Sequence, residues 1–330
     1  MNPGFHRLAL VASIVALCVV ALGAYVRLSH AGLGCPDWPG CYGRLTWPDA
    51  THEVHAANEA FPERPVEVHK AWKEMFHRYL AGFLVLLVLL INYRAWKLAG
   101  RGASHRFHSG LLLGLILFQA ALGMWTVTLQ LMPLVVLAHL MGGMATFALL
   151  VWLAARTGLP ARYEPSRAVK SVRNWILIGL LVLIVQISLG GWTSANYAAL
   201  ACLGFPGCGP EFWPASGFDS GFTLLREIGV NYEGGVLDLA ARQAIHMTHR
   251  LGGVVTFVVL AVLAVRLMRG PITRRSGALL LFLVLLQVTL GVLNIELVLP
   301  LPNAVAHNAV AAVLLAQMTW LLHRSTPHTG

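Results

Sequence analysis

The chain has 330 residues, of which 57% are hydrophobic and 12% are charged. A soluble domain carries about 25% charged residues, so this composition excludes an ordinary soluble protein and indicates an integral membrane protein. The net charge of +10 could suggest nucleic acid, but the basic residues gather in three short segments, around 94–106, 156–173 and 266–275. That arrangement argues against a nucleic-acid partner and is typical of loops beside anionic membrane lipids.

Eight apolar runs are long enough to cross a bilayer, which takes about 20 residues each. We place the spans at 7–27, 75–96, 108–129, 134–155, 174–195, 246–267, 276–298 and 303–323. The first run is longer than a signal-peptide core and no small-residue cleavage site follows it, so we expect it to be retained. The predicted fold class is an all-α integral membrane protein.

The basic loops alternate with two longer, acidic segments, 28–74 and 196–245. The positive-inside rule then places both termini in the cytoplasm and both long segments outside. We expect a multi-pass protein of the bacterial inner membrane, with its long cysteine-bearing loops in the periplasm.

Each long loop carries a C-x5-C pair, Cys35 with Cys41 and Cys202 with Cys208. Paired cysteines outside the cytoplasm favour disulfides. Redox-active or metal-binding thiols are the rival interpretation, although the C-x-x-C spacing of such motifs is missing. Cys18 stands alone in the first span.

Four histidines occupy strongly apolar stretches in two copies of one pattern. His77 in EMFHRYLAG corresponds to His249 in HMTHRLGG, and His139 in VLAHLMGG corresponds to His307 in AVAHNAVA. An imidazole inside a membrane is costly and usually marks a functional site. Two histidines per half are the ligand number for two six-coordinate hemes, each held between two helices. A bare metal is less favoured because no carboxylate or cysteine cluster surrounds them.

The repeat extends beyond the histidines. QAALGMWTV aligns with QVTLGVLNI, and GAYVRLS aligns with GGWTSAN. Each half therefore reads as a four-helix unit, and four spans return the chain to its starting side. This predicts two bundles related by a pseudo-twofold axis along the membrane normal, with domains at 1–160 and 161–330.

Arginines and glycines flank the histidines. Arg78 and Arg250 each follow a candidate ligand and could pair heme propionates, or reach into the membrane interface. Small residues nearby permit close approach of a flat ligand or of a neighbouring helix: Gly82, Gly142, Gly143, Gly252 and Gly253.

The halves differ three residues before the first histidine of each pair, where Glu74 corresponds to His246. Residues i and i+3 share a helix face, so Glu74 is expected to point toward the same heme as His77. A carboxylate there can take protons or stabilise positive charge. Alternatively, Glu74 pairs with a nearby Lys or Arg. Arg27 aligns with Ser194 and adds to this asymmetry.

GAYVRLSHAGLGCPDWPGCYGRL, EMFHRYLAG, AHLMGG, HMTHRLGG and AHNAVA together resemble the heme A synthases, over about residues 8–323. The resemblance implies eight helices in two four-helix bundles. It also implies an oxidoreductase that converts heme O to heme A, oxidising one methyl group to a formyl group by successive hydroxylations. The product serves heme-copper cytochrome oxidases.

By position, the resemblance implies that His77 and His139 hold the substrate heme O, with Glu74 as the catalytic carboxylate. It implies that His249 and His307 ligate a resident heme B, so that 1–160 is the substrate bundle and 161–330 the cofactor bundle. This chain departs from shorter members by its second cysteine pair and by an insertion around 209–245, which could cover the second heme or dock a partner.

Two alternatives stay open at this point. A non-catalytic diheme b-type cytochrome would use the same four histidines, and a transporter or heme-delivery chaperone would carry heme as cargo. Expected partners of a synthase are heme O synthase, because the isoprenoid tail of heme O is insoluble in water, and cytochrome oxidase assembly factors. A homo-oligomer also remains open.

Overall fold

The computed structural model describes residues 3–97, 103–158, 164–165, 167–209 and 212–327. Within these residues the protein is all-helical and has eight helices long and apolar enough to cross a membrane. The predicted fold class is therefore confirmed. The predicted domain boundary between residues 160 and 161 lies outside the described residues.

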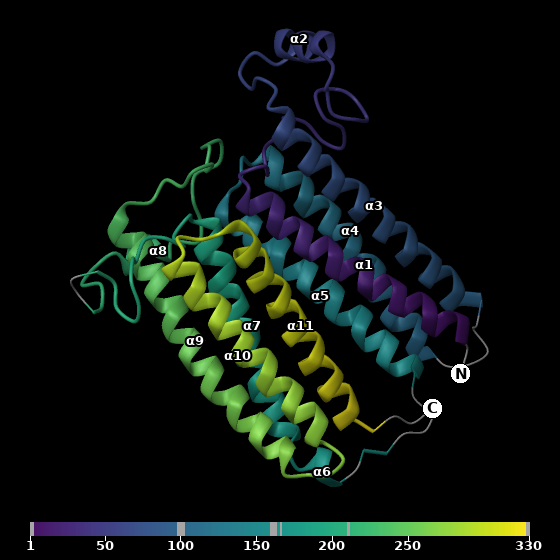
Figure 1. The fold of residues 1–330 in the computed structure, drawn as a ribbon. Helices are drawn as coiled ribbons and strands as arrows, with labels where there is room; N and C mark the ends of the chain where they lie inside the picture. Colours follow the sequence, from purple (N-terminus) through teal and green to yellow (C-terminus); the bar gives the residue numbers. More distant parts are fainter. Residues whose placement is uncertain (1–2, 98–102, 159–163, 166, 210–211, 328–330) are drawn as a thin grey trace.

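The long helices form two groups of four, which lie side by side in Figure 1. The first group comprises α1 (Pro3–Leu28), α3 (Val68–Lys97), α4 (Ala103–Thr128) and α5 (Pro133–Gly158). The second comprises α7 (Arg173–Ala195), α9 (Leu239–Met268), α10 (Arg274–Glu296) and α11 (Leu301–Ser325). Three short helices lie outside the bundles: α2 (Thr51–Ala60), α6 (Arg167–Lys170) and α8 (Phe218–Gly221).

Helices pack in the same order within each group. In the first, α1 contacts α3, α3 contacts α4, α4 contacts α5, and α5 closes the ring on α1. The second repeats this ring with α7, α9, α10 and α11. Between the groups, α5 contacts α11. In addition, α1 of the first group contacts α11, and the equivalent helix α7 of the second group contacts α5. These contacts are unchanged when equivalent helices are exchanged, as a pseudo-twofold relation requires; the axis itself stays a prediction.

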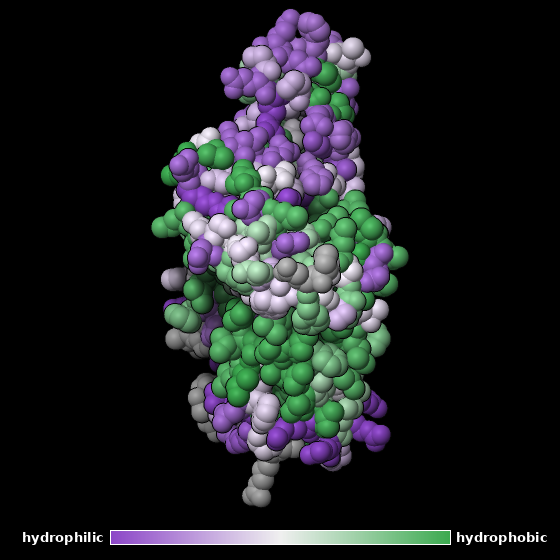
Figure 2. All heavy atoms as spheres, turned by 90° about the vertical axis from the view of Figure 1, so that its left-hand side faces the viewer, coloured by the Kyte–Doolittle hydropathy of each residue, from purple (hydrophilic) through white to green (hydrophobic). Residues whose placement is uncertain are grey.

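Small residues allow the two groups to approach closely. Ala9, Ala12 and Ala16 of α1 are buried in the same cluster as Leu314 and Met318 of α11. Without a hydrophobic driving force in lipid, helix association depends on such close packing. Large apolar side chains instead cover the outside, where Figure 2 shows an apolar belt between two hydrophilic ends.

The short turns after α4 and after α10 are built alike. Gln130 and Leu131 have φ of 47° and 61°, and Val298 and Leu299 have φ of 56° and 59°. These left-handed residues are not glycine, which is uncommon. In each turn the second of them donates its N–H to a carbonyl oxygen of the preceding helix, Leu131 to Thr126 at 2.8 Å and Leu299 to Asn294 at 2.7 Å. The start of α1 and the end of α11 lie at one end of the bundles, and α2 stands clear of the other end (Figure 1).

Candidate heme site

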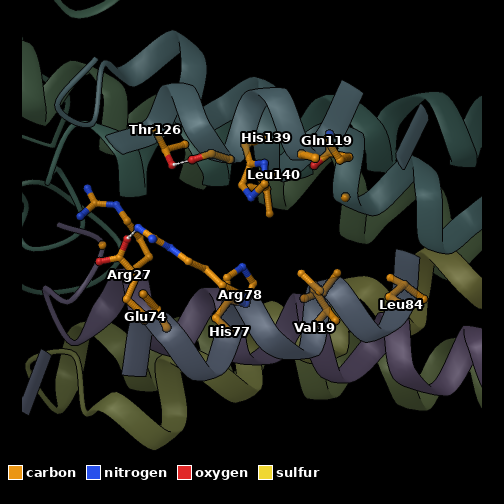
Figure 3. A pocket seen from close by; sticks show the side chains of 18 of the residues that line it. Val19, Arg27, Glu74, His77, Arg78, Leu84, Gln119, Thr126, His139 and Leu140 are labelled. Carbon is orange, nitrogen blue, oxygen red and sulfur yellow. Dashed lines mark hydrogen bonds and ion pairs between the residues drawn. The ribbon is translucent and has the colours of Figure 1, made fainter. Parts of the chain in front are cut away.

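A cavity of about 820 Å³ lies among the helices of the first group. Its size is within the range of small-molecule sites. Figure 3 shows His77 of α3 and His139 of α5 pointing toward one another from opposite walls. Gly191, Ser194 and Asn308 of the second group complete the wall. The structure therefore brings together the first predicted histidine pair.

Each of the four histidines packs against a glycine of a neighbouring helix. A Cβ added at Gly23 would lie 3.0 Å from Cε1 of His77, and one at Gly123 would lie 3.4 Å from Cε1 of His139. The second group repeats both contacts, with Gly190 beside His249 at 3.1 Å and Gly291 beside His307 at 3.2 Å. A Cβ at Gly23, Gly190 or Gly291 would require the imidazole to shift by a few tenths of an ångström, whereas one at Gly123 would be at ordinary contact distance.

The glycines singled out from the sequence do not make these contacts. Gly142 and Gly252 lie against Gln119 and Gln186, and a Cβ at Gly82 would meet nothing within 4 Å. They do permit close approach, since Gly142 and Gly252 each pack against a neighbouring helix and Gly82 and Gly143 line the cavity. The glycines beside the first histidine pair, Gly23 and Gly123, lie in the aligned segments GAYVRLS and QAALGMWTV.

Unpaired imidazole nitrogens support a heme at these sites. Nδ1 of His77, His139 and His307 is buried without a hydrogen-bond partner. An orphaned buried polar atom is unusual and calls for a ligand or a functional reason. Over the part of the chain that the structure describes, no three His, Cys, Asp or Glu side chains gather to hold a bare metal ion. Two facing histidines beside a large apolar cavity instead suit an iron whose other four ligands come from a porphyrin.

The second histidine pair is engaged by side-chain amides. Nε2 of Gln186 lies 3.1 Å from Nδ1 of His249 and donates to the His249 carbonyl oxygen at 3.0 Å. Gln287 lies 3.2 Å from His307 Nε2. In the first group, the position equivalent to Gln186 is Val19, which lines the cavity. Partners of this kind orient a ligand imidazole, so the two pairs differ in how firmly they are held.

Glu74 lines the cavity and is also part of the local structure. Its side chain is buried, accepting a hydrogen bond from Arg78 Nη2 at 2.5 Å and one from the Cys35 backbone N–H at 2.9 Å. His246 accepts the equivalent bond from Cys202 N–H at 3.4 Å. Glu74 therefore lines the same cavity as His77 and also forms the alternative ion pair with Arg78; that it faces a heme stays a prediction.

Arg78 and Arg250 hold the cysteine loops. Arg78 Nη1 donates to the carbonyl oxygens of Asp37 at 2.9 Å and of Gly40. Arg250 donates to the carbonyl oxygens of Gly207 at 2.6 Å and of Cys202 at 2.7 Å. The sequence did not indicate this role. Pairing of these arginines with heme propionates stays a prediction. It would require guanidinium N–H groups that do not already bind the loop carbonyls.

Both cysteine pairs form disulfides, Cys35–Cys41 and Cys202–Cys208, and Cys18 is free. Beside the first disulfide, burial raises the pKa of Tyr42 to about 12. The Tyr42 hydroxyl donates to the Pro65 carbonyl oxygen at 3.3 Å. Each loop is therefore a compact cap, tied to the helix that carries the first histidine of its pair.

Part of the insertion around 209–245 crosses to the first group. Tyr232 N–H donates to the Gln130 carbonyl oxygen at 3.0 Å, and the Tyr232 side chain packs in one cluster with Leu131. Glu233 pairs with Arg64 at 3.4 Å. This segment therefore ties the two groups together at the end that carries the disulfide loops, a role that the sequence did not suggest.

Comparison with known proteins decides the family. The COX15-CtaA family, described as cytochrome oxidase assembly protein, matches residues 6–319. The chain belongs to this family. It is 44% identical to the heme A synthase of Shewanella oneidensis strain MR-1 over 95% of each chain. The heme A synthase of Caulobacter sp. strain K31 is 29% identical over 95% of this chain and 94% of its own.

A more distant relative, the heme A synthase of Shouchella clausii, is 27% identical over 65% of this chain and 67% of its own. The resemblance stated from the sequence motifs is confirmed. His77 of α3 and His139 of α5 line one cavity, and a porphyrin held between them stays a prediction. Glu74 presents a carboxylate in the wall of the same cavity.

Proposed function

We propose that this chain is a heme A synthase, which oxidises one methyl group of heme O to a formyl group by successive hydroxylations. The observation that carries the proposal is the cavity itself, where His77 and His139 face each other and Glu74 lies in the wall. Family membership and the 44% identity to a heme A synthase support it.

The two halves take different roles in this proposal. The N-terminal bundle, 1–160, binds the substrate between His77 and His139, and the large cavity there supports exchange of a bulky ligand. The C-terminal bundle, 161–330, keeps a heme B on His249 and His307. The contact of Gln186 with His249 supports a cofactor that stays in place.

Converting a methyl to a formyl group adds one oxygen atom, and with water as its source the reaction releases four electrons and four protons per methyl group. A resident heme, when bound, supplies an iron that can accept electrons. Glu74 is placed to stabilise positive charge at the porphyrin edge or to take a released proton. Arg78 and the Cys35 N–H keep its carboxylate at a fixed point of the cavity wall.

The setting follows from the same assignment. Arg7 near the start of α1, Arg156 at the end of α5 and Arg324 at the end of α11 support cytoplasmic termini in a bacterial inner membrane. The disulfide-bonded loops would then lie in the periplasm. The proposed partners are heme O synthase and cytochrome oxidase assembly factors, and a homo-oligomer remains a prediction.

One pair of variants tests the division of roles. We expect His139→Ala, made in cells that produce heme O, to lose heme O and heme A but to keep heme B. We expect His307→Ala to lose heme B. Mass analysis of the extracted hemes checks both. Equal loss of one heme type in both variants would indicate two equivalent sites, as in a diheme cytochrome, and would contradict the proposal.

A further inference from the structure

Arg27 lies at the outer end of the cavity, in the last turn of α1. Gly23, four residues earlier, packs against the His77 ring. Four helical residues advance about 6 Å and return to nearly the same face. Arg27 therefore stands on the cavity side of α1, one turn beyond the level of His77. Figure 3 shows it at the same end as the Arg78–Glu74 pair.

This end of the cavity carries an excess of positive charge. The charged side chains in the wall are Arg27, Glu74 and Arg78. Glu74 and Arg78 form an ion pair at 2.5 Å, whereas Arg27 has no carboxylate partner among the described residues. A partly buried cation without a counter-ion is costly, so an anionic ligand would be stabilised here.

The Arg27 guanidinium is already oriented. Its Nη2 donates to the Ser194 carbonyl oxygen at 2.6 Å, at the end of α7, and its Cζ lies 4.0 Å from the centre of the Tyr197 ring. Its hydrogen bonds to the Ser194 and Ala195 carbonyl oxygens both come from Nη2, so Nη1 remains available to a ligand, whereas Nε is buried. Arg27 is thus a fixed cation with a donor to spare, whereas the Nη groups of Arg78 already bind loop carbonyls and Glu74.

This feature belongs to the first half alone. Arg27 aligns with Ser194, so the repeat places no cation at the equivalent point of the second half. By contrast, Arg78 and Arg250 are equivalent and hold equivalent loops. A cation confined to the proposed substrate half suits a task that only the substrate requires.

We propose that Arg27 anchors a propionate carboxylate of the heme O substrate and so fixes the rotation of the porphyrin within the cavity. The methyl group that becomes the formyl group shares its pyrrole ring with a propionate. An anchor at Arg27 would therefore bring that methyl toward the end of the cavity where Glu74 lies. This inference rests on the proposed function and names Arg27 as a positioning residue of the site.

The test uses the full-length protein, purified from cells without heme O so that only the resident heme is present. Heme O and its propionate dimethyl ester are titrated separately and binding is followed by visible absorption. We expect the wild type to bind heme O more tightly than the ester. In Arg27→Gln this preference should fall about tenfold to a hundredfold, with affinity for the ester unchanged.

Arg64→Gln is the matched control. Arg64 also joins the two halves at the outer end, through the Leu33 carbonyl oxygen at 2.8 Å and Glu233 at 3.4 Å, but it does not line the cavity. We expect it to keep the wild-type preference. Two results would overturn the inference: equal weakening of heme O and ester binding by Arg27→Gln, or the same loss of preference in Arg64→Gln. Either would show that Arg27 acts by holding the two halves together and not by binding a propionate.

Two further outcomes are decisive. If Arg27→Gln loses the resident heme and does not fold, the affinities of the wild-type protein for heme O and for its dimethyl ester are compared instead. Equal affinities would overturn the inference. If wild-type protein binds heme O independently of His139, as shown by an unaffected His139→Ala variant, the proposed function fails and this inference fails with it. An unchanged preference in Arg27→Gln overturns the inference alone.

Discussion

At the residue scale, one side chain carries both a structural bond and the proposed chemistry. Glu74 and His246 occupy equivalent positions and both accept a hydrogen bond from the backbone N–H of the first cysteine of their loop. That bond alone does not require a carboxylate, since an imidazole makes it in the second half. The charge of Glu74 is therefore the feature that the first half adds.

Glu74→Gln separates the two roles, because glutamine keeps the size and an acceptor oxygen but loses the charge. We expect heme binding to persist and formyl product to fall by about a hundredfold or more, the usual scale of a lost acid–base group. Extracted hemes are quantified by mass. Glu53→Gln is the control, since Glu53 pairs with Arg44 away from the cavity. Wild-type product in Glu74→Gln would remove Glu74 from the chemistry.

Gly23→Ala tests the close approach of α1 to His77. The added methyl would lie 3.0 Å from the ring, and overpacking of this kind costs about 1–3 kcal/mol. We expect weaker heme O binding in a titration, with the resident heme kept. Gly190→Ala should do the reverse and weaken the resident heme.

Gly114→Ala is the control for both glycine variants, because nothing lies within 4 Å of a Cβ at Gly114 in α4. There the change should be neutral or slightly stabilising, since alanine favours helix over glycine by about 0.5–1 kcal/mol. Unaltered heme binding in Gly23→Ala would contradict the close packing of His77.

The placement of the four histidines could be predicted because a polar residue in an apolar span is visible in one dimension and the pattern repeats. Glu74 could be singled out because the second half has His246 at the equivalent position. The contacts of Arg78 and Arg27 could not. Their partners are backbone carbonyls of Gly40 and Ser194, and which carbonyl a guanidinium meets depends on the fold of a loop or on the packing of the other half.

At the scale of the elements, the eight spans are confirmed as long apolar helices, and two of these helices begin furthest before the predicted spans. Helix α3 begins at Val68 and α9 at Leu239, several residues before the predicted starts at 75 and 246. Their first turns are polar and leave the apolar belt, so hydropathy does not reveal them. Asp238 caps α9 by accepting from the Ala241 N–H at 2.8 Å.

Each disulfide loop is an element that supports its helix, which yields a prediction for the first pair. Closing so short a loop stabilises a fold by about 2 kcal/mol. Replacing both Cys35 and Cys41 by Ser should lower stability by about that amount. It should also reduce heme A, because the loop holds Arg78 and the Cys35 N–H holds Glu74.

Thermal unfolding and heme extraction measure both effects of losing the first disulfide. Cys18→Ser is the control, since Cys18 is a free cysteine in α1, and it should match the wild type. The same two changes at Cys202 and Cys208 should loosen the resident heme and spare Glu74. If the first double variant keeps full stability and full product, the loop does not support the site.

At the scale of the whole molecule, the two four-helix groups pack alike but differ in particular side chains. The order in which the helices pack, the turns after α4 and α10 and the glycine–histidine contacts are the same in both groups. Differences concentrate where a heme would touch the wall, at Val19 against Gln186 and at Arg27 against Ser194. Sequence alignment of the halves exposes these differences, but their consequence depends on which side chains line the cavity.

The central claim is that one half binds a substrate heme and the other a resident heme. The most direct measurement is to express the chain in cells that make heme O, purify it, and identify the extracted hemes by mass. The account predicts heme A or its hydroxylated precursor together with heme B. Heme B alone, at two per chain despite available heme O, would contradict it and indicate an electron-transfer cytochrome.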